Sequence, residues 1–378
     1  MRARLARRTP ALAGSVAVCL GMLAGSGAAD VARAEEPAPC ADSFATEALP
    51  AGASLAPDLE GLLAGVPPPE FRFGIEAEPD PAAETARPGA LPMFDRPQPL
   101  WIAALSVIAI GGSAANAFQE QPRFPWHYTK EGWFGQETYA GGADKASHIV
   151  SYYAVARMMK EANRTFGMSE DSAILLASGV SLAAGIGTEI GDGTNKYGFS
   201  WEDVAADAIG AAAGYAIMKT KSEDLVGFRA GIVPAPDVVY GGLGKDYSAE
   251  IYTADLKIAG LGKRLHFDPS IARFLLLSAT YGSKGYPYSE PDVRQRQIGI
   301  ELGINFREVL TALHVPPHRW WGVILYTFFD VVRLPYTAWG FRYDLNHDKW
   351  HGPDTGDTFP NSGFPDVRGP APRGAARR

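Results

Sequence analysis

Histidine and carboxylate side chains recur in three short motifs within an otherwise apolar stretch, and these residue types can bind metal ions or transfer protons. The first motif, DKASH, spans residues 144–148 and places Asp144 and His148 four positions apart, on one face of a helix. The second is EIGDG at 189–193, and the third is SWEDVAAD at 200–207. Together they give a candidate polar cluster of Asp144, His148, Glu189, Asp192, Asp203 and Asp207.

One imidazole with several carboxylates is a donor set that suits Zn, Mn or Fe. His148, Glu189 and Asp207 are the candidate metal ligands, and a water bound to such a divalent metal could act as a nucleophile. The sequence contains no H-E-x-x-H, G-x-S-x-G or P-loop motif. The metal is therefore a hypothesis, and no residue is assigned a catalytic role.

Some residues of this cluster could instead have purely structural roles at helix ends and turns. Asp144 could be the N-cap of a helix. Ser200 with Asp203 resembles a capping box, in which Asp replaces the usual Glu. Asp192 followed by Gly193 is a turn signal after a helix end. Caps and turns would explain these residues without any ligand.

Two acidic residues fit such roles less well. Glu189 stands at the C-terminal end of a predicted helix, where the helix dipole disfavours a carboxylate. Asp207 lies among Ala and Gly, where an ionised carboxylate is costly unless it is paired. Each needs a partner such as protonated His148, Lys145 or a cation. His148 itself could be a ligand or a hydrogen-bonded core residue.

Four predicted helices would position these motifs. They cover 99–118, 144–164, 172–190 and 200–219. Ala and Gly crowd the last two, which favours close packing of their backbones. If neighbouring helices run antiparallel, the start of the second, the end of the third and the start of the fourth meet at one end of a bundle. The three motifs would then converge.

The hydrophobic period changes from helical to two beyond residue 227. Candidate strands cover 228–234, 251–259, 273–282 and 298–306, with turn residues between them. An aromatic segment follows at 319–329, together with Trp339, Phe341 and Tyr343, which could be an interfacial segment or the cover of a sheet. The sequence predicts an α+β fold: an antiparallel bundle of about four helices at 99–220, then a small one-sided antiparallel β-meander at 227–345.

The termini indicate export. Four Arg residues within the first eight precede an apolar stretch and an A-x-A site at 32–34, which predicts a signal peptide over 1–34. A short membrane anchor is the alternative. Residues 35–98 are rich in Pro and Ala and are predicted to be a disordered linker, and 346–378 a loose tail. Cys40 would be the one cysteine left after cleavage.

Net charge and hydropathy limit the kinds of partner that are expected. The whole chain has a net charge of -7, and residues 1–34 hold five Arg and one Asp, so the remainder carries -11. This excludes nucleic acid as an expected partner, whereas a membrane surface or an envelope component is expected. Residues 99–118 are uncharged and could be either a membrane span or a buried core helix. A location in the periplasm or cell envelope follows.

The chain resembles the YfiM-like family of periplasmic lipoproteins at D-K-x-x-H (144–148), E-I-x-D-G (189–193) and S-W-x-D-x-x-A-D-x-x-G (200–210). Segments 245–252, 279–286 and 294–306 are similar to an extra C-terminal region of longer members. Thr188 stands where shorter members often have Lys, and a lipobox cysteine is lacking. The resemblance implies the compartment and the fold, and it brings no activity.

Two functions are compatible with these features. The first is a non-catalytic structural or binding protein of the envelope, in which the carboxylate and His residues hold one end of the bundle together. The second is a metal-dependent hydrolase acting on lipid or envelope polymer, with the metal-bound water as nucleophile. Metal content of the purified protein distinguishes them in the first instance.

Overall fold

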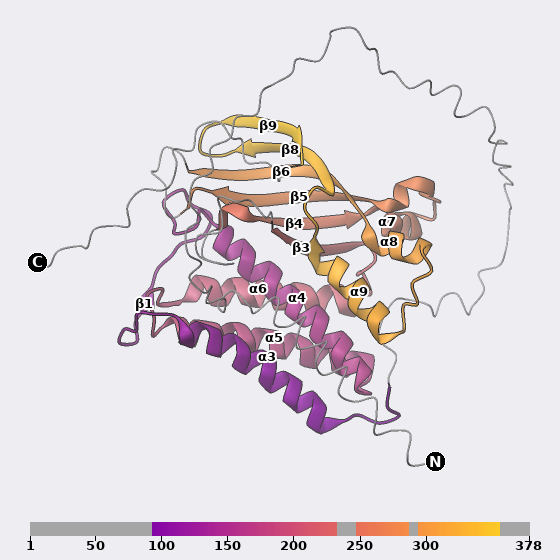
Figure 1. Ribbon diagram of the computed structural model, residues 1–378, viewed down its shortest axis with the longest axis horizontal. Coiled ribbons are helices and arrows are strands. Elements are labelled where there is room, and N and C mark those ends of the chain that lie inside the picture. Colours follow the sequence, from indigo (N-terminus) through magenta and orange to yellow (C-terminus); the bar gives the residue numbers. More distant parts are fainter. Residues whose placement is uncertain (1–92, 233–246, 287–293, 356–378) are drawn as a thin grey trace, which may run out of the picture. The chain divides into compact units, whose positions relative to one another are not determined.

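Four long helices follow one another through residues 99–219 of the computed structural model, which describes residues 93–232, 247–286 and 294–355 (Figure 1). They are α3 (Pro99–Gln119), α4 (Ala143–Thr165), α5 (Glu170–Asp192) and α6 (Trp201–Lys219). Each begins and ends within two residues of its predicted bounds. The prediction of an α+β fold, with helices preceding a β region, is confirmed.

Local sequence signals place the helix ends. Pro99 is the first residue of α3, where a missing N–H costs nothing. Ser169 and Ser200 are the N-caps of α5 and α6, and their hydroxyl oxygens accept hydrogen bonds from the backbone N–H groups of Ser172 and Asp203. These caps satisfy donors that the first helical turn leaves without partners.

Small residues allow the helices to pack tightly. Met159 of α4 and Val180 of α5 belong to one buried apolar cluster that α3 also joins. A side chain at Gly185 of α5 would collide with Asp207 of α6, and one at Gly210 would collide with the backbone of α4. The Ala- and Gly-rich composition of α5 and α6 therefore brings the polar residues of these helices within contact distance.

The predicted signal peptide (1–34) and most of the predicted linker (35–98) lie outside the described residues. The end of that linker, from residue 93 onward, packs on the bundle. The backbone N–H of Met93 donates to the carbonyl of Thr165, and the ring of Phe94 stacks on that of Phe166, with centroids 6.2 Å apart.

A seven-stranded sheet in the order β7-β3-β4-β5-β6-β8-β9 forms the second half of the fold. Its antiparallel strands are β3 (Val226–Ile232), β4 (Glu250–Lys257), β5 (Leu275–Lys284), β6 (Gln295–Ile304), β8 (Ala338–Asp344) and β9 (Lys349–Asp354). The edge strand β7 (Val332–Arg333) pairs with β3 in parallel. The predicted meander corresponds to β3 to β6.

Short elements connect these strands and helices. They are the pair β1 (Tyr128–Thr129) and β2 (Phe199–Ser200), the helices α7 (Ile258–Leu265), α8 (Phe306–Ala312) and α9 (Trp320–Val331), and the 3-10 turns η1 (Tyr247–Ala249) and η2 (Ser270–Phe274).

The C-terminal part differs from the expectation in two ways. The aromatic segment 319–329 is largely the helix α9, whereas Trp339, Phe341 and Tyr343 lie in strand β8 and are part of the sheet rather than its cover. The expected loose tail from residue 346 instead begins with strand β9, which is held by its pairing with β8. Pairing to a neighbour stabilised a segment whose own composition gave no strand signal.

The sheet buries charged side chains on one face and exposes aliphatic side chains on the other, which is the reverse of a typical soluble protein. On β6, Glu301 is 1% exposed, whereas its neighbours Ile300 and Leu302 are 64% and 53% exposed. Arg333 of the edge strand β7 pairs with Glu301 and also donates to the carbonyl of Thr355, just beyond the opposite edge strand β9. The sheet therefore curls around its charged face and leaves aliphatic side chains outside. The expected one-sided meander packed on the helices is correct for only part of the sheet.

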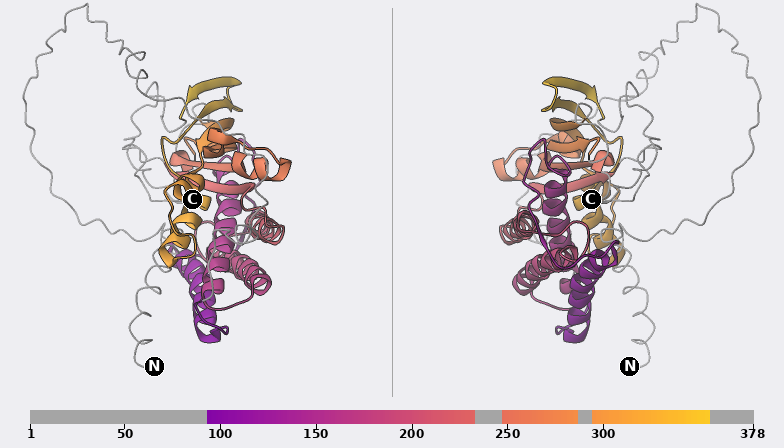
Figure 2. Two further views of the ribbon diagram at one scale, coloured as in Figure 1. Left: turned by 90° about the vertical axis from the view of Figure 1, so that its right-hand side faces the viewer. Right: turned by 90° about the vertical axis from the view of Figure 1, so that its left-hand side faces the viewer.

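Helix α4 provides the main contact between the helices and the sheet, and it packs on β3, β4 and β5. The ring of Tyr153 meets that of Phe228 edge-on at 5.2 Å, beside Ile217 and Val331. In both views of Figure 2 the four helices gather on one side, and β8 and β9 lie on the side of the sheet away from them.

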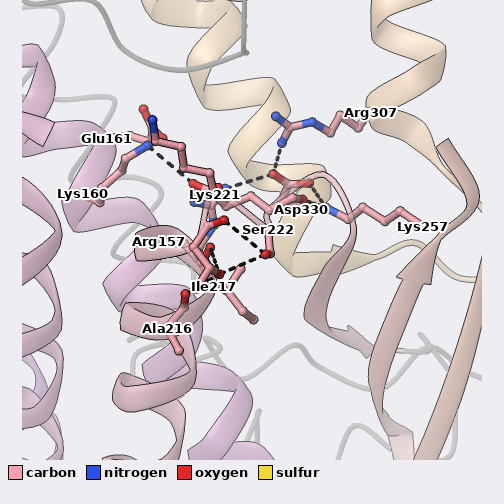
Figure 3. A network of polar contacts seen from close by, with 12 residues as sticks. Arg157, Lys160, Glu161, Ala216, Ile217, Lys221, Ser222, Lys257, Arg307 and Asp330 are labelled. Carbon is pink, nitrogen blue, oxygen red and sulfur yellow. Dashed lines mark hydrogen bonds and ion pairs between the residues drawn. The ribbon is translucent and has the colours of Figure 1, made fainter. Parts of the chain in front are cut away.

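A buried ionic network ties α4, α8, α9 and the sheet together (Figure 3). The carboxylate of Asp330 accepts from Arg157 at 3.1 Å and from Lys257 at 2.7 Å, and it also pairs with Arg307. Burial alone would raise the pKa of Asp330, but these three cations hold it well below its usual range. Burial lowers the pKa of Lys257, and the positive charge of the neighbouring Arg307 lowers it further. The attraction of Asp330 opposes this shift but does not cancel it.

Among the described residues, two helices, α3 and α5, are long and apolar enough to cross a membrane by length and composition. The most apolar window of α3 is 22% buried and that of α5 is 44% buried. Residues 99–118 are therefore not the fully buried core helix that the sequence offered as the alternative to a span.

We expect Asp330→Asn to lower the free energy of unfolding by about 3–5 kcal/mol, because it leaves Lys257 and Arg307 without their carboxylate and Arg157 with Glu223 alone. The folded-state pKa of Asp330 is depressed, so its contribution is complete above the unfolded pKa of about 3.9 and is lost as the pH falls through the folded value. Urea unfolding from pH 7 to pH 3 should show the difference between the proteins shrinking only below about pH 4.

Asp171→Asn is the matched control, because Asp171 pairs with Lys219 on the exposed surface. It should leave the unfolding midpoint unchanged. Equal destabilisation by the two variants would contradict the role given to the buried network.

Candidate functional site

The start of α4, the end of α5 and the start of α6 meet at one end of the bundle, as the up-down arrangement predicts. Asp144 and His148 come from α4, Glu189 and Asp192 from α5, and Asp203 and Asp207 from α6. Five of these residues line one small cavity, and Asp207 lies directly behind His148. We call these six residues, together with Lys145 and Glu131, the acidic centre.

His148 is oriented by Asp207. The Nδ1 of His148 lies 2.7 Å from Oδ1 of Asp207, which is fully buried, so this nitrogen donates to the carboxylate. The Nε2 on the other side of the ring is 3.7 Å from Oδ1 of Asp144 and 4.0 Å from Oδ1 of Asp203. Metal-binding His residues commonly donate their other ring N–H to a carboxylate, as Nδ1 of His148 does here.

Lys145 neutralises the other side of the centre. Its Nζ lies 2.5 Å from Asp203, 2.7 Å from Asp144 and 2.7 Å from Glu131. Asp144 also accepts a hydrogen bond at 2.6 Å from the hydroxyl of Tyr247, which stands just before strand β4. Burial would raise the pKa of Asp144, but His148 and Lys145 outweigh it and hold the pKa well below its usual range.

Asp144 is not the N-cap of α4, contrary to one structural alternative. The cap position is Gly142, with φ 92°, and Asp144 lies in the first turn, where its carboxylate faces the centre. Gly142 is required there, because its left-handed backbone and the nearby ring of Phe134 leave no room for a side chain. Because Gly142 takes the cap position, the carboxylate of Asp144 can bind Lys145 and Tyr247.

Glu189 finds a partner at the next helix. Its Oε2 accepts from the backbone N–H of Ser200 at 3.1 Å, so this carboxyl group lies at the N-terminal end of α6 although it opposes the dipole of its own helix. Asp192 accepts from Nδ2 of Asn195 at 2.6 Å, and Gly193 is the C-cap of α5. Ser200 and Asp203 make the predicted cap contact while Asp203 also binds Lys145.

Negative charge exceeds positive charge in this centre. Six carboxyl groups face the two cationic side chains of Lys145 and His148. Burial raises the pKa of Glu189 to about 9, that of Glu131 to about 8 and that of Asp192 to about 6. Glu189 and Glu131 therefore hold a proton near neutral pH unless a cation takes its place.

For His148 and Asp207 too, burial and the neighbouring charges shift the pKa in opposite directions. Burial would lower the pKa of His148, but the charges of Asp207 and Asp203 raise it well above its ordinary value. Burial raises the pKa of Asp207, although His148 opposes the shift. The second oxygen of Asp207, Oδ2, is buried and has no hydrogen-bond donor within the described part of the chain.

In the part of the chain that the structure describes, two groups of side chains offer metal-ligand atoms that all lie within 4.8 Å of one another. One is Asp144, His148 and Asp203, and the other is His148, Glu189 and Asp207, the predicted ligand set. The adjoining cavity has a volume of about 160 Å³ and is lined mainly by the acidic centre and by Tyr139, Tyr197 and Tyr247. This space fits a hydrated ion or a small polar group.

The predicted cluster does not include Glu131 or Tyr247. Glu131 lies in the aromatic-rich loop before α4, and no spacing relates it to the helical motifs. Tyr247 belongs to the segment 245–252 that carried part of the family resemblance, and this was the one available signal. Both reach the centre only because the loop and the sheet fold back onto the start of α4.

Residues 130–219 match the family model described as Predicted periplasmic lipoprotein (DUF2279). The matched segment contains α4, α5 and α6 and every charged member of the acidic centre. The match supports an uncharacterised periplasmic family and places the protein in the periplasm or cell envelope. No curated protein and no solved structure matches the chain.

We expect Glu189→Ala to lower the free energy of unfolding by about 1–3 kcal/mol, because it leaves the buried N–H of Ser200 without an acceptor. Glu189→Gln retains an acceptor oxygen and should be close to wild type. Chemical denaturation monitored by circular dichroism measures both.

Glu202→Ala serves as the control, since Glu202 lies in the same first turn of α6 and is partly exposed. A loss for Glu202→Ala as large as that for Glu189→Ala would show that the effect comes from the helix end rather than from the centre.

Proposed function

We propose that this protein is a non-catalytic binding protein of the cell envelope, and that the acidic centre binds a divalent cation. The observation that carries the proposal is the charge imbalance: six carboxyl groups and two cationic side chains share one largely buried centre. A cation would replace the protons that burial holds on Glu189 and Glu131. Zn, Mn or Fe suits a donor set of one imidazole and several carboxylates.

The orientation of His148 supports a first set of ligands. With Nδ1 donating to Asp207, Nε2 faces Asp144 and Asp203 and would bind the metal from the side of the cavity. Asp207 then acts as the carboxylate behind the histidine, a position that usually affects metal affinity strongly. Glu189 lies close enough to join as a further ligand. Lys145 would keep its place between Asp144 and Glu131.

A bound cation would join elements that are distant in the sequence. It would link the ends of α4, α5 and α6, and through Tyr247 it would link them to the sheet. The YfiM-like resemblance and its extra C-terminal β region fit this proposal, since Tyr247 comes from that region. The exposed apolar residues of α3 and of the sheet favour association with a membrane or another envelope component.

A metal-dependent hydrolase acting on lipid or envelope polymer is the second candidate. The cavity beside Nε2 of His148 favours it, because its volume would accommodate a metal-bound water. Hydrolysis of a p-nitrophenyl ester by the metal-loaded protein, abolished in His148→Ala, would favour this candidate. Stoichiometric metal binding without turnover would favour the non-catalytic one.

Metal content of the purified mature protein tests the centre directly. Elemental analysis should show about one divalent ion per chain, and His148→Ala should lose it. Asp207→Asn should weaken metal affinity about 10–100-fold, because the imidazole loses its orienting carboxylate. His347→Ala is the matched control: His347 also pairs with an aspartate, Asp344, but lies outside the centre, and its loss should leave metal content unchanged.

Affinity for the metal should rise with pH up to about 9, the pKa of Glu189. His148 and Glu189 have raised pKa values, so both carry protons at pH 7, and both must release them before they can bind a cation. Titration calorimetry in two buffers of different ionisation enthalpy measures the released protons. A pH-independent affinity with no proton release would contradict this ligand set.

A further inference from the structure

An apolar groove of about 1190 Å³ lies between α4 and the sheet. Ala146, Ile149 and Val150 form its helical wall, and Ile298 and Ile300 of β6 belong to its sheet wall. None of the described residues that line it carries a charge. The groove lies on a different side of α4 from Asp144 and His148, so it is separate from the acidic centre.

The sheet wall of the groove exposes large apolar side chains to water, which is energetically unfavourable. Ile300 is 64% exposed and Trp350 of β9 is 68% exposed, and these residues are part of a wider apolar surface along β5, β6 and β8. A water-soluble protein rarely leaves so large an apolar patch without a partner. The alternation of β6 excludes an accident of packing, because Glu301 is buried in an ion pair while Ile300 faces out.

A cation stands at one end of this groove. Arg296 precedes Ile298 on the same face of β6, because side chains alternate along a strand. Its Nη1 donates to the carbonyl of Phe134, which lines the groove, and its Nε donates to Oδ1 of Asn346 at 2.7 Å. Both acceptors are neutral. Within the described residues no carboxylate pairs with this guanidinium, so its charge can interact with an anionic group arriving at this end.

We propose that the groove binds the acyl chain of a single-chain anionic amphiphile, such as a fatty acid, with its carboxylate at Arg296. The uncharged walls complement a hydrocarbon chain, and the volume of about 1190 Å³ exceeds the usual range for ligand pockets, about 300–1,000 Å³, so a long acyl chain fits inside it. One ligand would use both features, since hydrocarbon alone gives no role to Arg296 and a small anion gives none to the walls. This site is independent of the cation proposed above.

Quenching of tryptophan fluorescence by dibrominated stearate, added below its critical micelle concentration, tests the groove, because Trp350 lines it. Quenching of the full-length mature protein should saturate. Ile300→Glu should weaken binding at least about tenfold, because it places a carboxylate on the apolar wall. Leu302→Glu is the matched control: Leu302 is on the same strand and face and is similarly exposed, but it does not line the groove.

Arg296→Gln tests the headgroup end. It should weaken binding of dibrominated stearate about tenfold, because a charge-assisted hydrogen bond is lost, and leave binding of the corresponding brominated alcohol unchanged. Circular dichroism shows whether each variant is folded.

Three outcomes would overturn the proposal. Equal loss for Ile300→Glu and Leu302→Glu would assign the effect to the whole face rather than to the groove. Quenching by brominated lipid vesicles but not by monomeric dibrominated stearate would make the face a bilayer contact. A dimer in gel filtration that Ile300→Glu dissociates, with no quenching by the fatty acid, would assign the face to self-association.

Discussion

The fold depends on pairing the charged side chains that it withdraws from water. Asp330 is surrounded by three cations, Glu301 is held by Arg333, and Asp207 is held by His148. An unpaired charge at any of these positions would cost several kcal/mol, which is a large part of the stability of a typical domain. Because the interior of the curled sheet is occupied by ion pairs, the aliphatic side chains of its strands have no interior to enter. The exposed apolar face is thus a consequence of where the charges are buried.

Helix α4 connects three of these features along its length. Its first turns carry Asp144 and His148 on one side and Ala146 and Val150 on another, so the acidic centre and the groove share the same short segment. Further along, Arg157 reaches Asp330. Two tyrosines from the sheet region hydrogen-bond to the start of this helix. The hydroxyl of Tyr247 donates to Asp144, and that of Tyr281 donates to the carbonyl of Gly141, which lies just before the helix. A change in charge at the centre would therefore act directly on the contact between helices and sheet.

Helix positions and their polar motifs could be predicted because their signals are local. Spacing of four puts Asp144 and His148 on one face, and serines mark the starts of α5 and α6. The meeting of three helix ends then follows from short connections alone. Glu131 and Tyr247 could not be found this way, because loop and sheet bring them in from outside the helical repeat. Alternation on β6 showed which side chains share a face, but not that the polar face would be the covered one. That choice depends on Arg333 and Arg342, which come from strands with weak signals of their own.

The acidic centre has two ways to balance its charge, and they differ in what they respond to. Protons on Glu189 and Glu131 balance it. Burial raises the pKa of these two groups to about 9 and about 8, because His148 beside Glu189 and Lys145 beside Glu131 only partly offset the loss of water. A divalent cation would balance the same charge and would allow both groups to ionise. Exchange between the two states would move protons, so under this proposal the state that prevails would depend on pH and on the concentration of the metal together. The carboxylate of Asp330, which is fully paired by Lys and Arg, holds no proton near neutral pH that a cation could replace. The contrast between these two buried carboxylate clusters in one protein is the physical reason for assigning a binding role to one and a structural role to the other.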